Sequence, residues 1–286
     1  IFLTLSDWQI RKADVDFVKA PYGQFCQTVK EKFPHVVGLK ALPGFNKKIN
    51  EVIGENHGCH HLVTSVIETM RTGRQLAIVP QSMIHLLDFQ DSTKMRQLDL
   101  LLFPNIGNSC RAYNLENGSL VPGSGMTGLN ASMYPIESQP AQSFERTKEI
   151  IALREDGHLK LGVHMQDNVH DVRLEVTVDT KENLIVNTTA RFDRFPYYGI
   201  CEEMIRLVTR LEGSRMESEI KEKIYKEIGG PRGCTHLVDF FIDLVNLYPF
   251  LKVSNGYLYN KAEPYSRKMV LSEFPSLKGT CRAFNF

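Results

Sequence analysis

The residues best suited to chemistry lie in a short stretch that the chain contains twice. Residues 233–237 read Gly-Cys-Thr-His-Leu, and residues 58–62, 175 positions earlier, read Gly-Cys-His-His-Leu. The same shift of 175 pairs Cys26 with Cys201, so each half places its second cysteine 33 positions after its first. A thiol with an imidazole two residues later is typical of half a metal site, of a reactive thiol, or only of a tight helix start.

The first hypothesis is one metal site of Cys3His type in each half of the chain. The second half would supply Cys201, Cys234, His236 and Cys281, and the first half Cys26, Cys59, His61 and Cys110. Thiolates and imidazoles are the ligands that zinc and iron–sulfur centres prefer, so zinc or an iron–sulfur cluster is the expected cofactor. Cys234 lies near an expected helix N-terminus, where partial positive charge lowers a thiol pKa. Substitute ligands are His170 in the second half and His57 or His60 in the first.

Three other interpretations stay open. In a thiol-dependent enzyme, Cys234 would be the nucleophile and His236 or His170 its base. In a structural or interaction module, the cysteines would be small buried residues, a common fate of free cysteine. Disulfides between the halves are a further possibility, limited by the compartment.

The repeat extends well beyond the Gly-Cys stretch and defines the expected domains. A second block, residues 103–114, returns at 274–285 with a shift of 171, and all six cysteines fall within repeated blocks. We therefore expect one copy at 1–114, a linker rich in Gly, Ser, Pro and Asn at 115–143, and a second copy at 144–286.

The pattern of apolar residues predicts an α+β fold, in which each copy is an antiparallel β-meander followed by three helices. Alternation in the second copy predicts strands at 145–154, 158–165, 172–178 and 184–192. Helical spacing predicts helices at 197–211, 217–228 and 234–250, and in the first copy at 22–34, 45–53 and 59–87. The first copy starts only at the equivalent of the third strand. We expect the two copies to pack as a pseudo-twofold pair.

Composition and charge narrow the class of protein. The chain has 286 residues, 42% of them hydrophobic and 23% charged, which is ordinary for a globular protein. A net charge of +1 gives no electrostatic reason to expect nucleic acid or an acidic membrane surface as a partner. No apolar run approaches membrane-spanning length, and the apolar stretch at residues 1–5 is too short for the core of an export signal, so we expect neither a membrane span nor export. Six cysteines in so large a chain favour a reducing cytoplasm.

The second half also resembles a bacterial family of domains of unknown function, family 2889. The resemblance covers about residues 144–250, and the segments that carry it are 145–146, 154–157, 170–174, 211–213 and 230–237, together with Asp167, Pro196 and Cys201. The first half departs from this pattern, because it has His60 where the second half has Thr235 and has no partner for His170. The family implies no activity. A looser likeness, to iron–sulfur scaffold proteins with a meander, helices, three cysteines and a histidine, is an analogy only.

Overall fold

The computed structural model divides the chain into two compact units. It describes residues 1–4, 7–18, 20, 22–42, 44–54, 58–77, 79–116, 144–217, 219–253, 266–273, 275–279 and 281–286. Unit 1 consists of residues 1–75 and 253–286, and unit 2 of residues 76–252. This division departs from the expected domains, because 76–114 belong to unit 2 and 253–286 to unit 1. The expected linker lies outside the described residues except for 115–116.

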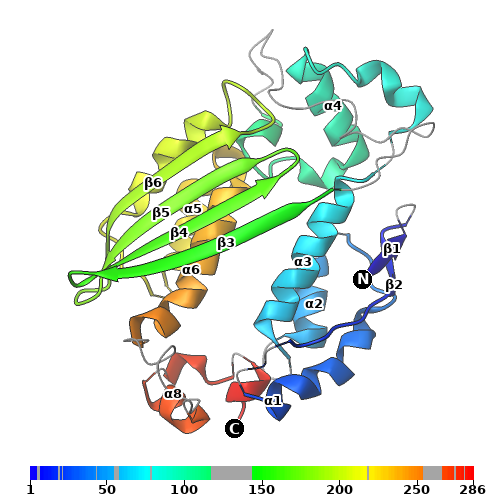
Figure 1. The fold of residues 1–286 in the computed structure, drawn as a ribbon. Helices are drawn as coiled ribbons and strands as arrows, with labels where there is room; N and C mark the ends of the chain where they lie inside the picture. Colours follow the sequence, from blue (N-terminus) through cyan, green and yellow to red (C-terminus); the bar gives the residue numbers. More distant parts are fainter. Residues whose placement is uncertain are drawn as a thin grey trace. The chain divides into compact units, whose positions relative to one another are not determined.

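Unit 2 is organised around an antiparallel meander of four strands, in the order β3-β4-β5-β6 (Figure 1). The strands are β3 (Arg146–Glu155), β4 (His158–Asp167), β5 (Asp171–Asp179) and β6 (Leu184–Arg194). In β5, Val172, Leu174, Val176 and Val178 are buried and the residues between them are more exposed, as expected for a sheet with one face on the core. The antiparallel sheet and the α+β class are therefore confirmed.

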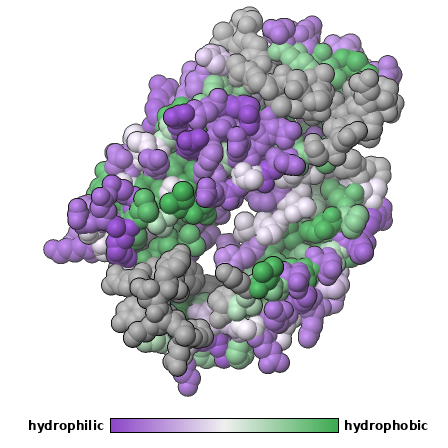
Figure 2. All heavy atoms as spheres, viewed as in Figure 1, coloured by the Kyte–Doolittle hydropathy of each residue, from purple (hydrophilic) through white to green (hydrophobic). Residues whose placement is uncertain are grey.

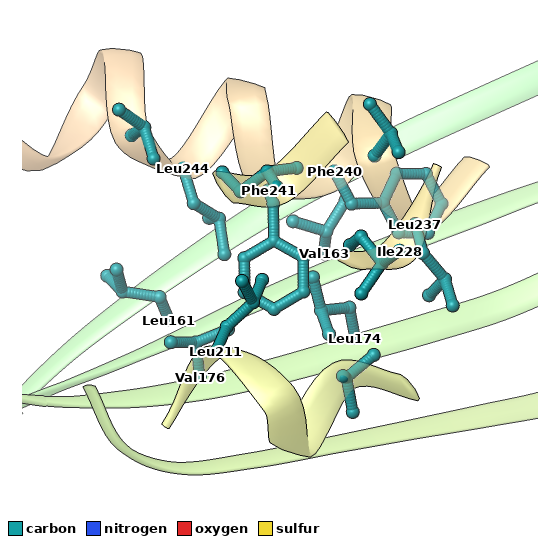
Figure 3. Close-up of a cluster of buried hydrophobic side chains, with 14 of the residues drawn as sticks. Leu161, Val163, Leu174, Val176, Leu211, Ile228, Leu237, Phe240, Phe241 and Leu244 are labelled. Atoms are coloured by element: carbon teal, nitrogen blue, oxygen red, sulfur yellow. The ribbon is translucent and has the colours of Figure 1, made fainter. Parts of the chain in front are cut away.

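Helical segments cover the buried face of this sheet. They are the 3₁₀ helix η8 (Glu202–Leu211), α5 (Ile220–Ile228), the short η9 (Gly230–Arg232) and α6 (Thr235–Val253). Phe240 and Phe241 of α6 are almost fully buried, and Phe241 points towards strand residues such as Val163 and Leu174 (Figure 3). Burying one such aromatic ring contributes about 1.5–3 kcal/mol. On the other face of the sheet, hydrophilic residues cover much of the surface (Figure 2).

The segment between Leu76 and Glu116 adds a second, smaller core to unit 2. It contains η4 (Gln81–Leu86), α4 (Ser92–Leu102), η5 (Pro104–Ile106) and η6 (Arg111–Tyr113). Asp91 caps α4 by accepting hydrogen bonds from the amides of Thr93 (2.9 Å) and Lys94 (3.2 Å). Buried side chains of this segment, including Met95 and Leu98, pack in one cluster with Tyr197. Residues from the first half of the sequence thus complete a core around a residue from the second.

Unit 1 has the same kinds of helix but a much smaller sheet. Two short strands, β1 (Phe2–Thr4) and β2 (Gln9–Lys12), pair antiparallel. The helices are α1 (Gln24–Gln27), η1 (Thr28–Glu31), η2 (Phe33–Val36), α2 (Phe45–Ile53), α3 (His60–Arg74), α8 (Arg267–Glu273), η10 (Pro275–Leu277) and η11 (Arg282–Phe284).

Three of the expected helices differ from the structure, and the one expected at 22–34 is divided into the three short segments α1, η1 and η2. The helix expected at 59–87 ends at Arg74, and a separate 3₁₀ helix, η4, begins directly after Pro80, whose nitrogen has no hydrogen to donate. The helix expected at 197–211 begins only at Glu202, because Gly199 takes a left-handed conformation (φ 81°). The helix expected at 45–53 is confirmed at both ends. Among the described residues, no helix is long and apolar enough to cross a membrane.

The two units share local backbone geometry at positions 175 residues apart. Trp8 and Asn183 are both left-handed, with φ of 55° and 58°. The Ile10 amide donates to the Leu39 carbonyl (2.9 Å), and the Ile185 amide donates to the Ser214 carbonyl (2.9 Å). In each unit, this bond ties the second strand of the pair to the chain that leads to the following helix.

Candidate functional site

The Gly-Cys turn is a tight approach of two backbone segments in each unit. In unit 2 the Cys234 amide donates to the Ile228 carbonyl (2.8 Å), and in unit 1 the Cys59 amide donates to the Ile53 carbonyl (2.8 Å). A Cβ at Gly233 would lie 2.0 Å from the Ile228 oxygen, and one at Gly58 would lie 1.7 Å from the Ile53 oxygen. Only glycine fits at either position, so the repeated glycine has a steric reason.

In unit 2, three cysteines from three separate segments surround this turn. Cys234 directly precedes α6, Cys201 precedes η8, and Cys110 precedes η6. The Arg111 amide donates to the Gly233 carbonyl (2.8 Å), and Thr235 Oγ1 donates to the Ser109 carbonyl (3.2 Å), so Cys110 is held against the turn from both sides. The neighbouring thiols of Cys234 and Cys110 add to burial in raising the pKa of Cys201 well above its usual value.

Unit 1 assembles an equivalent cluster from Cys26, Cys59 and Cys281. The Arg282 amide donates to the Gly58 carbonyl (2.9 Å), which matches the bond from Arg111 to Gly233 in unit 2. Burial raises the pKa of the Cys59 thiol, and the neighbouring thiols of Cys281 and Cys26 raise it further. Each cluster therefore brings together one cysteine from the Gly-Cys turn, one from the preceding helical segment and one from a distant block.

The third cysteine of each cluster is not the one that we expected from the order of the sequence. The expected sets placed Cys281 with Cys201 and Cys234, and Cys110 with Cys26 and Cys59. In the structure Cys281 belongs to unit 1 and Cys110 to unit 2, so the third cysteine is exchanged between the two sets. The shift of the last block from 175 to 171 gave no hint of this exchange, because a repeat does not say which copy a segment packs against.

The thiols are free, and burial raises the pKa of all three in unit 2. All six cysteines are free. Burial raises the pKa of Cys234 to about 12, although the amides of Leu237 and His236 act in the opposite direction. The expected lowering of this pKa at a helix start is therefore wrong, because desolvation of a thiolate outweighs two amide dipoles here. Within the described ranges, no three His, Cys, Asp or Glu side chains are arranged so that they could hold a metal ion.

The histidines of the expected metal sites, His236 and His61, each lie near another histidine ring. The His236 ring lies 4.3 Å from the ring of His170, centroid to centroid, and the His61 ring lies 6.2 Å from that of His60. His61 is exposed. His57 lies outside the described residues. The pairing of His170 with His236 joins two residues that the sequence offered as alternative bases for Cys234.

A buried carboxylate fixes His170. Asp167 accepts hydrogen bonds from the amides of Val169 (2.7 Å) and His170 (2.6 Å), lies 3.2 Å from His170 Nδ1, and pairs with Arg146 at 2.7 Å. Arg194 donates to the carbonyl of Asp167. Burial alone would raise the pKa of Asp167, but the hydrogen bond and charge of His170 and the charge of Arg146 outweigh it and hold the pKa well below its usual range. The loop from β4 to β5 is thereby set in one conformation.

A second buried carboxylate was missed from the sequence. Asp99 on α4 accepts hydrogen bonds from the hydroxyls of Tyr113 (2.8 Å) and Tyr197 (2.5 Å), whose rings meet edge to face at 5.6 Å. In unit 1 the equivalent aromatic pair is Tyr22 and Phe284, at 5.2 Å. The sequence did show Tyr22 and Tyr197 at the common shift of 175, which was the one available signal.

Comparison with known proteins assigns the chain to a family. The model of the family described as protein of unknown function (DUF2889) matches residues 1–75 and 151–248, more than half of the chain, so the chain belongs to this family. The resemblance seen in the second half is thereby confirmed, and the match includes the first half as well. No curated protein and no solved structure matches the chain.

Proposed function

We propose that this member of the DUF2889 family is an accessory protein built from two copies of one domain, each of which binds a thiophilic metal at a cluster of three thiols. The metal would be zinc or the iron of an iron–sulfur centre, both of which favour thiolate ligands. The ligand sets are Cys110, Cys201 and Cys234 in one unit and Cys26, Cys59 and Cys281 in the other. The matched backbone bonds at Gly233 and Gly58 support two copies of one domain.

The observation that carries this proposal is the environment of the sulfur atoms. Each of four thiols lies directly before a helical segment, where two backbone amides act to lower its pKa against the larger effect of burial, which raises it. These thiols occupy the same two positions in both units: Cys59, Cys234, Cys110 and Cys281. Amides that face a sulfur stabilise a thiolate and are part of the surroundings that tune metal–thiolate sites.

The raised pKa values are consistent with metal-coupled deprotonation. A buried thiol without a cation stays protonated, because its thiolate would be a buried, uncompensated charge. A bound metal supplies the compensating charge and releases the thiol protons. Because the thiols are not arranged as a closed site, loading requires them to rotate or shift towards one another. His236 is the expected fourth ligand, and it would have to leave His170 to take that place.

The metal content of cysteine variants should follow the ligand sets given above, in which Cys110 belongs to unit 2 and Cys281 to unit 1. Zinc and iron in the purified protein would be measured by elemental analysis, with zinc titration against a chromophoric chelator for protein that is isolated without metal. We expect two equivalents in the parent chain and one in Cys234→Ser, and the double variant Cys234→Ser/Cys110→Ser should also retain one. The double variant Cys234→Ser/Cys281→Ser should retain none. If the parent chain binds no more metal than a chain with all six cysteines replaced, the metal role is refuted.

A specific observation favours a second candidate, an interaction module whose cysteines are packing residues. The absence of a metal-holding arrangement among the described side chains, together with the deep burial of Cys234, suits this role. The same burial and the high pKa of Cys234 argue against a thiol nucleophile, which needs a reachable thiolate. Six free thiols suit a reducing compartment in either case.

A further inference from the structure

The last block of the chain packs against the half of the sequence that it does not directly follow. Residues 275–286 continue the second half of the sequence but lie in unit 1, whereas residues 103–114 continue the first half but lie in unit 2. Each block therefore serves the Gly-Cys turn of the other half. The two blocks share the sequence Cys-Arg-Ala-aromatic-Asn, at 110–114 and 281–285.

Backbone hydrogen bonds and buried side chains hold each block against its Gly-Cys turn. In both blocks the amide after the cysteine donates to the glycine carbonyl of the turn, at 2.8 Å for Arg111 and 2.9 Å for Arg282. Both blocks close on themselves in the same way, since the Asn108 amide donates to the Tyr113 carbonyl (2.8 Å) and the Gly279 amide to the Phe284 carbonyl (3.1 Å). The block thus presents one preformed shape to one preformed turn.

The block is also needed to complete unit 1. Ala283 and Phe284 are 3% exposed, so their side chains are part of the interior of the unit. The guanidinium of Arg267, at the start of α8, lies 3.5 Å from the Phe25 ring centroid and 4.4 Å from that of Phe286. A unit 1 without this block would expose the Gly58 carbonyl, the Tyr22 ring and the thiols of Cys26 and Cys59.

We propose that the Cys-Arg-Ala-aromatic block is an exchangeable docking element, and that a second copy of this chain can supply it to unit 1. Nothing in the contacts requires the block and the turn to belong to one chain, and exchange of an identical element between chains is a low-cost route to dimers. The chain's own block competes at an effective concentration on the order of millimolar. Exchange is therefore expected when chains refold together at comparable concentrations. The inference does not depend on metal binding.

The test uses the full chain in two isotopic forms. Unlabelled and ¹⁵N-labelled protein are unfolded together in guanidinium chloride, refolded at about 1 mM, separated by size and oxidised with diamide. Mass spectrometry then identifies disulfides between Cys281 and Cys26 or Cys59. We expect mixed-label disulfides in the dimer fraction and same-label disulfides in the monomer. If these disulfides form in good yield but carry one label in every fraction, exchange between chains does not occur. If Cys281 pairs with neither cysteine, the docking itself is wrong.

A matched pair of variants tests the backbone bond. Arg282→Pro removes the amide donor, and proline suits this position because Cys281 is extended (φ −158°, ψ 172°) and residue 282 is the first of η11. Arg282→Ala keeps the amide and removes the side chain. One lost hydrogen bond should weaken the docking equilibrium about fivefold, so we expect Arg282→Pro to lower the yield of both same-label and mixed-label disulfides by up to that factor and Arg282→Ala to leave it unchanged. Equal yields from the two variants would overturn the role of this bond.

Discussion

Units 1 and 2 build the same Gly-Cys turn and surround it with different amounts of structure. In unit 2 a four-stranded sheet packs against α6, and Cys234 is 9% exposed. In unit 1 the described strands are only three and four residues long, and Cys59 is half-buried. The comparison shows that the turn geometry is set by its own glycine and backbone bonds, whereas the depth of the thiol depends on the layers around it.

The units also differ in how side chains secure the docked block. In unit 2 the buried Asp99 carboxylate joins Tyr113 of the block to Tyr197. In unit 1 the block carries Phe284 in place of Tyr113, and Arg267 instead stacks on Phe25. The backbone bond at the turn is common to both units, so it defines the docking mode, and the side chains around it are interchangeable solutions.

The largest expected difference between the units is in thiol reactivity. With a pKa of about 12, only roughly one Cys234 in 10⁴ is a thiolate at pH 8, and the sulfur is buried as well. Alkylation of the reduced, metal-free protein by iodoacetamide, followed by mass spectrometry, should modify Cys59 and Cys281 at least about a hundredfold faster than Cys234. Similar rates for all three thiols would show that the units do not differ in thiol burial.

Substitution of the turn glycines should destabilise both units strongly. An alanine Cβ at Gly233 or Gly58 would overlap a carbonyl oxygen, so Gly233→Ala and Gly58→Ala should each lower the free energy of unfolding by at least about 3 kcal/mol. Gly162→Ala is the control, because a Cβ there has nothing within 4 Å. Urea denaturation would measure the three variants, and a Gly233→Ala variant as stable as Gly162→Ala would contradict the tight approach.

A pair of equivalent core substitutions should separate the units. Ile49 on α2 and Ile224 on α5 lie 175 positions apart, and both are 0% exposed. Each change to alanine should cost about 2–5 kcal/mol. By hydrogen exchange, Ile49→Ala should raise exchange in α2 and α3 and leave β4 and β5 unchanged, and Ile224→Ala should do the opposite. If either variant raises exchange in both units alike, the division into two units fails.

The smallest expected effect is a pH dependence confined to unit 2. Since the folded pKa of Asp167 lies below its unfolded value, this carboxylate stabilises the fold at neutral pH, and the contribution is lost as the pH falls below about 4 towards the folded pKa. Asp167→Asn should remove on the order of 1–3 kcal/mol at pH 7, the range for hydrogen bonds to charged groups. The difference in stability from the parent should shrink on acidification. A difference that stays constant from pH 7 to pH 3 would exclude this role.

The sequence was a good guide where neighbouring residues determine structure. Alternation in β5 and the helical spacing of α2 gave the strand and helix within a residue or two, since both patterns reflect a single buried face. The glycine before each cysteine was visible as a repeat, although its steric cause, the carbonyl of Ile228 or Ile53, required coordinates.

The partners of the third cysteine could not be predicted from the sequence. Cys110 lies 124 positions before Cys234, and Cys281 lies 222 positions after Cys59. The repeat is equally consistent with each cysteine packing against the turn of its own half or of the other half. The pKa of Cys234 was likewise beyond the sequence, because it depends on burial by α6 and the sheet and not on the helix start alone. The close approach of the His236 and His170 rings joins α6 to the loop after β4, another contact between distant segments.

Each Gly-Cys turn receives its third cysteine from the other half of the sequence. A short thiol-to-thiol cross-linker such as dibromobimane, applied to dilute, reduced, folded protein and read by mass spectrometry, tests it directly. We expect links from Cys281 to Cys26 or Cys59, and from Cys110 to Cys201 or Cys234. Links from Cys281 to Cys201 or Cys234, with Cys110 joined to Cys26 or Cys59, would contradict it.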